Sequence, residues 1–151
     1  MSPEALEHYL HAHIPLSKAM EVTVLEARPE RVSLSAPLAP NINHRDTVFG
    51  GSASAVAILA AWSLLHIRLN EEGIASRLVI QRNTMSYALP MAGSFTAVAA
   101  MPSAADWALF LRIFKRRGRA RIAVASELHF EGQVAGRLEG EFAALSGVDA
   151  A

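Results

Sequence analysis

The chain has 151 residues, a length that predicts a single domain over residues 1–151. Its 14 lysines and arginines equal its 14 aspartates and glutamates, so no global field favours nucleic acid or an anionic membrane, and we expect neither partner. Apolar residues make up 52% and charged residues 19%, which excludes extended disorder. The absence of cysteine removes disulfides, thiolate metal sites and cysteine nucleophiles. Because the chain starts with polar and acidic residues, no signal peptide is indicated and we expect a cytoplasmic protein.

The first part of the chain predicts a short helix and two strands. Ser2 and Pro3 are typical of a helix start, and apolar residues then recur at helical spacing until Pro15. Apolar and polar residues alternate over 20–24 and again over 32–38, which predicts two strands joined by a turn.

A long apolar helix is predicted from Gly50 to about Glu72, with its end at Gly73. Residues 47–67 carry no charge when His66 is neutral, and a run of ~20 such residues is also what a membrane span needs. Small residues throughout the run instead favour a helix that is buried on most faces by other parts of the protein. We therefore expect a core helix and no membrane span.

The remaining elements predicted are strands over 77–89 and 94–101, a short helix between Ser103 and Gly118, and strands over 122–130 and 134–142. Together with the first two strands they make about six. The order predicts an α+β fold in which a curved antiparallel sheet wraps around the long helix. Such a sheet explains why that helix is apolar on nearly every face.

The start of the long helix is the first candidate site. Gly50 and Gly51 let a ligand approach the backbone closely. The first-turn N–H groups lack intrahelical partners and lie at the positive end of the helix dipole, where a carbonyl that becomes an oxyanion is stabilised. The alternative is that the two glycines only permit tight packing of the helix against the sheet.

Polar side chains in the preceding loop can also act chemically. The amide of Asn43 both donates and accepts hydrogen bonds, although an asparagine here can equally hold its own turn. His44 and Asp46 could form an acid–base pair, or they could be ordinary solvated loop residues.

The pattern N-x-N-H-x-x-T-x-F-G-G-S at residues 41–52 resembles that of the hotdog-fold acyl-thioester enzymes. More narrowly it is similar to the YiiD C-terminal domain and its stand-alone MadB-type relatives, which are labelled thioesterases and associated with malonyl-ACP decarboxylation. The resemblance covers nearly the whole chain. It implies a hotdog fold, a homodimer, and a substrate carried on acyl carrier protein (ACP) or coenzyme A. Strand edges left by a curled sheet must be covered or paired, and the strand over 77–89 is our candidate for pairing across a two-fold axis.

The resemblance also implies residue roles. Many hotdog thioesterases have His-Gly-Gly where this chain has Phe49-Gly50-Gly51, and an Asn or Gln about six residues earlier, which Asn43 matches. Asn43, Gly50 and Gly51 are therefore expected to be catalytic, and Phe49 and Ser52 to contact the substrate.

One departure from the family pattern bears on the reaction. Related thioesterases commonly carry an Asp or Glu on the central helix, about nine residues after the His, where this chain has Ile58. No carboxylate occurs from Gly50 to Asn70. Hydrolysis needs a base or nucleophile, whereas decarboxylation of a malonyl thioester needs only donors that stabilise an enolate. We expect conversion of malonyl-ACP to acetyl-ACP; a thioesterase that uses His44 or Asp46, and a non-catalytic acyl-ACP-binding domain, are the alternatives.

The dense basic cluster of the chain comprises Lys115, Arg116, Arg117, Arg119 and Arg121. Acidic ACP or the phosphates of coenzyme A could dock on it. The alternative is that these cations complement the C-terminus of the short helix. Arg82 is a further candidate for substrate binding.

The histidines near the N-terminus predict no metal site. The spacing of His8, His11 and His13 matches no common template, and no cysteine or fixed carboxylate completes a ligand set. The chain also lacks a Gly-rich phosphate loop and a dinucleotide fingerprint. We expect neither a metal nor a cofactor.

Overall fold

The computed structural model describes residues 1–101 and 103–147, so residues 102 and 148–151 of the expected domain lie outside the described residues. In chain order its elements are α1 (Pro3–His13), α2 (Pro15–Ala19), β1 (Thr23–Ala27), β2 (Arg31–Ala36), the 3-10 turn η1 (Ala39–Asn41), α3 (Gly50–Glu71), β3 (Arg77–Tyr87), β4 (Phe95–Ala100), α4 (Ala104–Arg117), β5 (Arg119–Phe130) and β6 (Gln133–Leu145). The strands form one antiparallel six-stranded sheet in the order β1-β2-β4-β5-β6-β3. The expected α+β architecture is confirmed.

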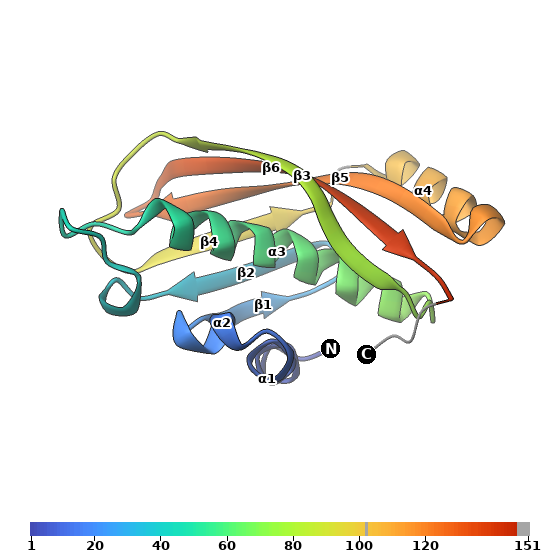
Figure 1. The fold of residues 1–151 in the computed structure, drawn as a ribbon, viewed down its shortest axis with the longest axis horizontal. Coiled ribbons are helices and arrows are strands. Elements are labelled where there is room, and N and C mark those ends of the chain that lie inside the picture. Colours follow the sequence, from blue (N-terminus) through green and yellow to red (C-terminus); the bar gives the residue numbers. More distant parts are fainter. Residues whose placement is uncertain (102, 148–151) are drawn as a thin grey trace.

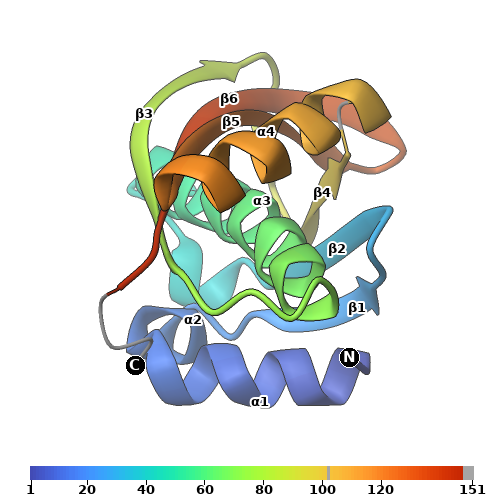
Figure 2. The same cartoon turned by 90° about the vertical axis from the view of Figure 1, so that its right-hand side faces the viewer.

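The sheet curves around α3, which lies along its concave face (Figure 1). Figure 2 shows the same arrangement from one end, with α1 below β1 and α4 above the end of α3. Alternate strand residues pack onto the helix, and Phe95, Leu138 and Phe142 are fully buried there. The Oγ of buried Ser126 donates to the carbonyl of Ala57 at 2.8 Å, which ties the sheet to the helix. Small residues on α3 make this close approach possible.

By length and composition α3 could cross a membrane, since its most apolar window has a mean hydropathy of 1.5. Within the domain, 61% of that window is buried against other elements. Its apolar residues therefore serve as the core of the fold, as expected.

Several element boundaries differ from the sequence prediction. β1 begins at Thr23, not at residue 20, because a second helix follows Pro15 and the chain then turns at Glu21, whose φ is 56°. Proline ends α1 but fits the first turn of α2. β3 ends at Tyr87, two residues early, because the next two N–H groups both donate to the carbonyl of Ala135. β5 and β6 are longer than expected.

The short helix α4 has the ends that the sequence predicts. The hydroxyl of Ser103 accepts from the Asp106 N–H at 3.0 Å, and Gly118 ends the helix in the left-handed region at φ 73°. Near its start, Trp107 lies under the guanidinium of Arg68, 4.7 Å from the ring centre. Because Arg68 belongs to the last turn of α3, α4 covers the C-terminal end of that helix (Figure 1).

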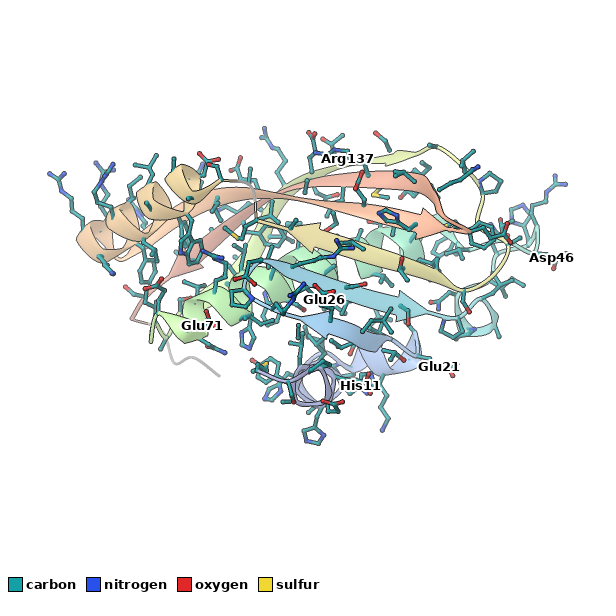
Figure 3. All side chains as sticks on the ribbon, turned by 180° about the vertical axis from the view of Figure 1, so that it is seen from behind. His11, Glu21, Glu26, Asp46, Glu71 and Arg137 are labelled. Atoms are coloured by element: carbon teal, nitrogen blue, oxygen red, sulfur yellow. The ribbon has the colours of Figure 1, made fainter. Side chains whose placement is uncertain are left out.

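One edge of the sheet, at β1, is covered, and the other, at β3, is open. α1 covers the β1 edge: a Glu7 Oε1 accepts from the Val24 N–H at 2.9 Å, and His11 Nε2 lies 2.8 Å from the Val22 carbonyl (Figure 3). The opposite edge strand, β3, is eleven residues long and, among the described strands, pairs only with β6. Its outer row of backbone groups is open to a further strand.

Candidate active site

A pocket of about 290 Å³ opens at the N-terminal end of α3. Its walls come from the helix start, from the chain after β3 and from the adjoining ends of β5 and β6. The lining residues are Val48, Gly50, Ala53, Tyr87, Ala88, Leu89, Pro90, Met91, Leu128 and Ala135. The lining contains no carboxylate, imidazole, amine or guanidinium, so the pocket is apolar with one phenol.

The start of α3 offers backbone donors to this pocket. The N-cap residue Phe49 makes no side-chain capping bond, and its carbonyl accepts the Ala53 N–H at 3.0 Å. Among the described residues, none accepts a hydrogen bond from the N–H groups of Gly50, Gly51 or Ser52. These three donors lie at the positive end of a 22-residue helix.

The two glycines at the helix start have different neighbours. A Cβ added to Gly51 would overlap the ring of Phe49. The half-exposed ring can therefore lie against the helix start only because residue 51 has no side chain. A Cβ added to Gly50 would meet the Tyr87 ring at 3.5 Å, an ordinary contact. The alternative interpretation predicted close packing of both glycines against the sheet. Gly51 instead packs closely against the Phe49 ring.

Tyr87 connects the end of β3 to the helix start. Its hydroxyl donates to the Gly50 carbonyl at 3.2 Å, while its side chain stays 58% exposed. Beyond it the chain returns to the site, where the Met91 carbonyl accepts from the Val48 N–H at 2.8 Å. This segment forms the rim of the pocket.

Asn43 organises the loop that leads to the pocket. Its Oδ1 accepts from the N–H groups of Arg45 (2.8 Å) and Thr47 (3.1 Å), and its Nδ2 donates to the Thr47 hydroxyl at 2.9 Å. An isolated bridge joins Ile42 to Val48, a lining residue. An amide carries two N–H donors, so one is left after the bond to Thr47. Asn43 itself does not line the pocket of the single chain.

Other predicted site residues lie away from the pocket. His44 and Asp46 are exposed, and Figure 3 shows Asp46 at the outer tip of its loop. Arg82 is in register with Glu141, between positions that face the buried Phe142 and Gly140, so its side chain lies on the face of the sheet opposite α3. Ile58 packs against the core. The structure thus brings only Gly50 of the predicted set into the pocket lining.

The basic cluster lies at the other end of the molecule. Lys115, Arg116 and Arg117 form the last turn of α4, and Arg119 begins β5. All four are exposed, and none forms an ion pair with the described residues. Arg121 lies 3.7 Å from Glu141.

A stack of aromatic rings joins α1 to α3, apart from the pocket. His66 lies between Tyr9 and Trp62, with ring centres at 4.6 and 4.8 Å, and the Asn70 Nδ2 lies 3.3 Å from its Nε2. Burial, and to a smaller extent the nearby His13, lower the pKa of His66. Within residues 1–101 and 103–147, no group of three His, Asp, Glu or Cys residues could hold a metal ion.

Sequence reasoning missed most of the pocket wall. Tyr87, Met91, Leu128 and Ala135 are 34 or more positions from Ala53 and share no motif with the helix start. For these four residues, the one local signal in the sequence that could have indicated the pocket was the aromatic residue Tyr87 at the end of a predicted strand.

Known proteins resemble this chain over nearly its whole length. A family model described as "Putative thioesterase (yiiD_Cterm)" matches residues 3–146. A crystal structure of a protein of unknown function from Chlorobaculum tepidum is 28% identical, with a TM-score of 0.90 over 96% of this chain and 94% of that one. A structure described as the putative thioesterase from Shewanella oneidensis is 23% identical (TM-score 0.81, 95% and 96% covered), and a thioesterase from Haemophilus influenzae is 11% identical (TM-score 0.75, 96% and 91% covered).

Proposed function

The chain belongs to the YiiD C-terminal family of thioesterase-like proteins, and from this premise we propose that it decarboxylates malonyl-ACP to acetyl-ACP. Family membership supports an acyl thioester as the substrate. The choice of reaction rests on one observation, which is that the pocket lining and the helix from Gly50 to Asn70 contain no carboxylate. Hydrolysis would need a base or nucleophile that this pocket does not supply.

Decarboxylation has requirements that the pocket can meet. The bond between the carboxylate carbon and the α-carbon breaks, carbon dioxide leaves, and the electron pair passes into the thioester as an enolate. The enolate α-carbon then takes a proton from water to give the acetyl thioester. Negative charge develops on the thioester oxygen, so donors at that oxygen lower the barrier. The free N–H groups of Gly50, Gly51 and Ser52 are donors of this kind.

Asn43 is proposed as an additional donor to the same oxygen. Its Oδ1 and one N–H hold the loop, which fixes the orientation of the amide. The second N–H remains for the substrate. A donor that is already oriented costs no reorganisation as charge develops.

We propose that the enzyme is a homodimer formed through β3. The β1 edge is capped by side chains of α1, whereas the β3 edge is long and open. An open edge of this length is a template for strand pairing. Light scattering at micromolar concentration should give twice the chain mass; a monomer mass would refute the dimer.

The decisive experiment on the reaction is mass spectrometry of purified protein incubated with malonyl-ACP. We expect acetyl-ACP as the product. Free carrier would identify a hydrolase, and unchanged substrate would identify a binding domain, so either result refutes the proposal. A substrate of this kind belongs to fatty acid biosynthesis, and the proposal therefore assigns the protein to the cytoplasm.

A further inference from the structure

The cluster formed by Lys115, Arg116, Arg117 and Arg119 carries more charge than its helix needs. A helix C-terminus is equivalent to about half a negative charge. Gly118 already caps α4, and its N–H donates to the Phe114 carbonyl at 2.7 Å. Four exposed cations without described ion pairs therefore leave a local positive pole on a chain whose net charge is zero.

This cluster cannot serve the pocket of its own chain. The pocket lies at the N-terminal end of α3, and α4 covers the C-terminal end of α3 through Arg68 and Trp107. At 1.5 Å per residue, the 22 residues of α3 separate the two ends by about 33 Å. Figure 3 shows the same separation, with Asp46 at one end of the molecule and Glu71 at the other, beside α4.

Pairing of β3 with a second copy removes this separation. An antiparallel pair that uses all of β3 is centred near Arg82, so the partner's Arg77 end lies beside Tyr87. In the sheet, Arg77 is in register with Leu145, and Leu145 with Arg119. Three strand spacings of ~4.8 Å therefore separate Tyr87 from Arg119 of the second copy, about 15 Å in all.

The symmetry of the pair also puts both features on one face. The two-fold axis of an antiparallel strand pair runs perpendicular to the sheet. Both copies of α3 and both copies of α4 then lie on the same side of the continuous sheet. The last turn of α4 in each copy, with Lys115, Arg116 and Arg117, then borders the pocket of the other copy. The side chain of Arg119 alternates with the buried Ala120 and lies on the opposite face of the sheet, so it does not take part.

We propose that the α4 cluster acts in trans, docking an acidic carrier protein so that its acyl arm enters the pocket of the other protomer. This inference rests on the proposed dimer and on the thioester substrate. A phosphopantetheine arm holds the thioester well away from the carrier, so cations some 15 Å from the pocket would meet the carrier surface and not the acyl group. Exposed cations at a helix end complement an acidic protein surface, which favours the carrier protein as the occupant.

Cross-linking tests the placement without any enzyme activity. The chain has no cysteine, so Tyr87→Cys and Arg117→Cys introduce the only two thiols, one at the pocket and one at the end of α4, two residues before Arg119. In the double variant, a bismaleimide of about 15 Å reach should give covalent dimers, because within one chain the two sites are ~30 Å apart along the sheet. Each single variant is the control and should stay monomeric on a denaturing gel. Absence of covalent dimers in the double variant would overturn the proposal.

Carrier binding tests the role of the charges. Titration with an acidic carrier protein should show at least a tenfold weaker Kd for Arg116→Glu/Arg117→Glu, and wild-type binding should weaken as salt rises. Lys18→Glu, at an exposed lysine on α2, is the control and should change Kd far less. Equal affinities of the three proteins for the carrier would overturn the proposal. A variant Arg116→Glu/Arg117→Glu that binds coenzyme A more weakly but binds the carrier as wild type does would also overturn it.

Mixed dimers then decide between cis and trans action. The test uses malonyl-ACP far below KM, where Arg116→Glu/Arg117→Glu alone should keep at most about a tenth of wild-type activity and Asn43→Ala less. If Asn43 serves the pocket of its own chain and the cluster works in trans, mixing the two variants restores one intact site per mixed dimer, or about a quarter of wild-type activity at random assortment. No recovery, with mixed dimers demonstrated by mass, would overturn the proposal. A wild-type protein that fails to decarboxylate would refute the proposed function instead, while the cross-link still reports the placement.

Discussion

Replacing Asn43 by aspartate separates its proposed chemical role from its structural one. Aspartate keeps the side-chain oxygen that accepts from the N–H groups of Arg45 and Thr47, and the Thr47 hydroxyl can reverse its bond and donate to the carboxylate. All three loop bonds can therefore persist in Asn43→Asp. The N–H donor proposed for the enolate is lost, and a negative charge takes its place.

The two variants of Asn43 should differ in stability and agree in activity. Asn43→Ala removes three hydrogen bonds, exposed or partly buried, at about 0.5–1 kcal/mol each, or about 1.5–3 kcal/mol in all. For a domain of this size that lowers Tm by about 3–12 °C, whereas Asn43→Asp should stay within about 2 °C of wild type. Loss of one oxyanion donor costs ~10²–10³ in kcat with little change in KM, so both variants should lose at least that much.

The assay pairs malonyl-ACP decarboxylation, followed by mass spectrometry, with thermal unfolding of each variant. Thr47→Val is the matched control, because it removes the partner of the Asn43 Nδ2 and leaves the amide in place. We expect this control to lose no more than several-fold in kcat. Full activity in folded Asn43→Asp would refute the donor role and leave Asn43 as a loop anchor only.

Three further outcomes are expected. Gly51→Ala should lower decarboxylation more than Gly50→Ala at unchanged or slightly higher Tm, because only a Cβ at position 51 displaces the Phe49 ring; equal losses in the two variants would contradict this role of the ring. Asp46→Asn should stay within several-fold of wild type, since asparagine tolerates the φ of 63° found there, whereas a hydrolase with this residue as its base would lose ~10²–10⁴. The pKa of His66 is lowered in the fold from its ordinary value of 6.5, because burial disfavours the charged ring, so its contribution to stability is complete above pH 6.5 and is lost as the pH falls below it; Tm should therefore drop as the pH is lowered through 6.5, and an equally steep dependence of Tm on pH in His66→Phe would exclude this group as the cause.

The sequence by itself determined the elements whose signals are local. Helix α3 is apolar on nearly every face, which predicts that a sheet surrounds it, and the structure has this arrangement. The ends of α4 at Ser103 and Gly118 follow from capping chemistry within a few residues. The missing carboxylate at Ile58 was also visible in the sequence, and it still carries the choice of reaction.

Only the tertiary structure decided which surfaces meet. Leu128 and Ala135 reach the start of α3 because β5, β6 and β3 are neighbours in the sheet, an order that side-chain periodicity does not encode. Arg82 has the charge for substrate binding, but the register of β3 turns its side chain to the opposite face. A pattern of residues fixes which face of an element is apolar, whereas long-range pairing fixes what that face contacts. The basic cluster is a further example, because the length of α3 separates it from the pocket of its own chain, a distance that the local sequence pattern does not give.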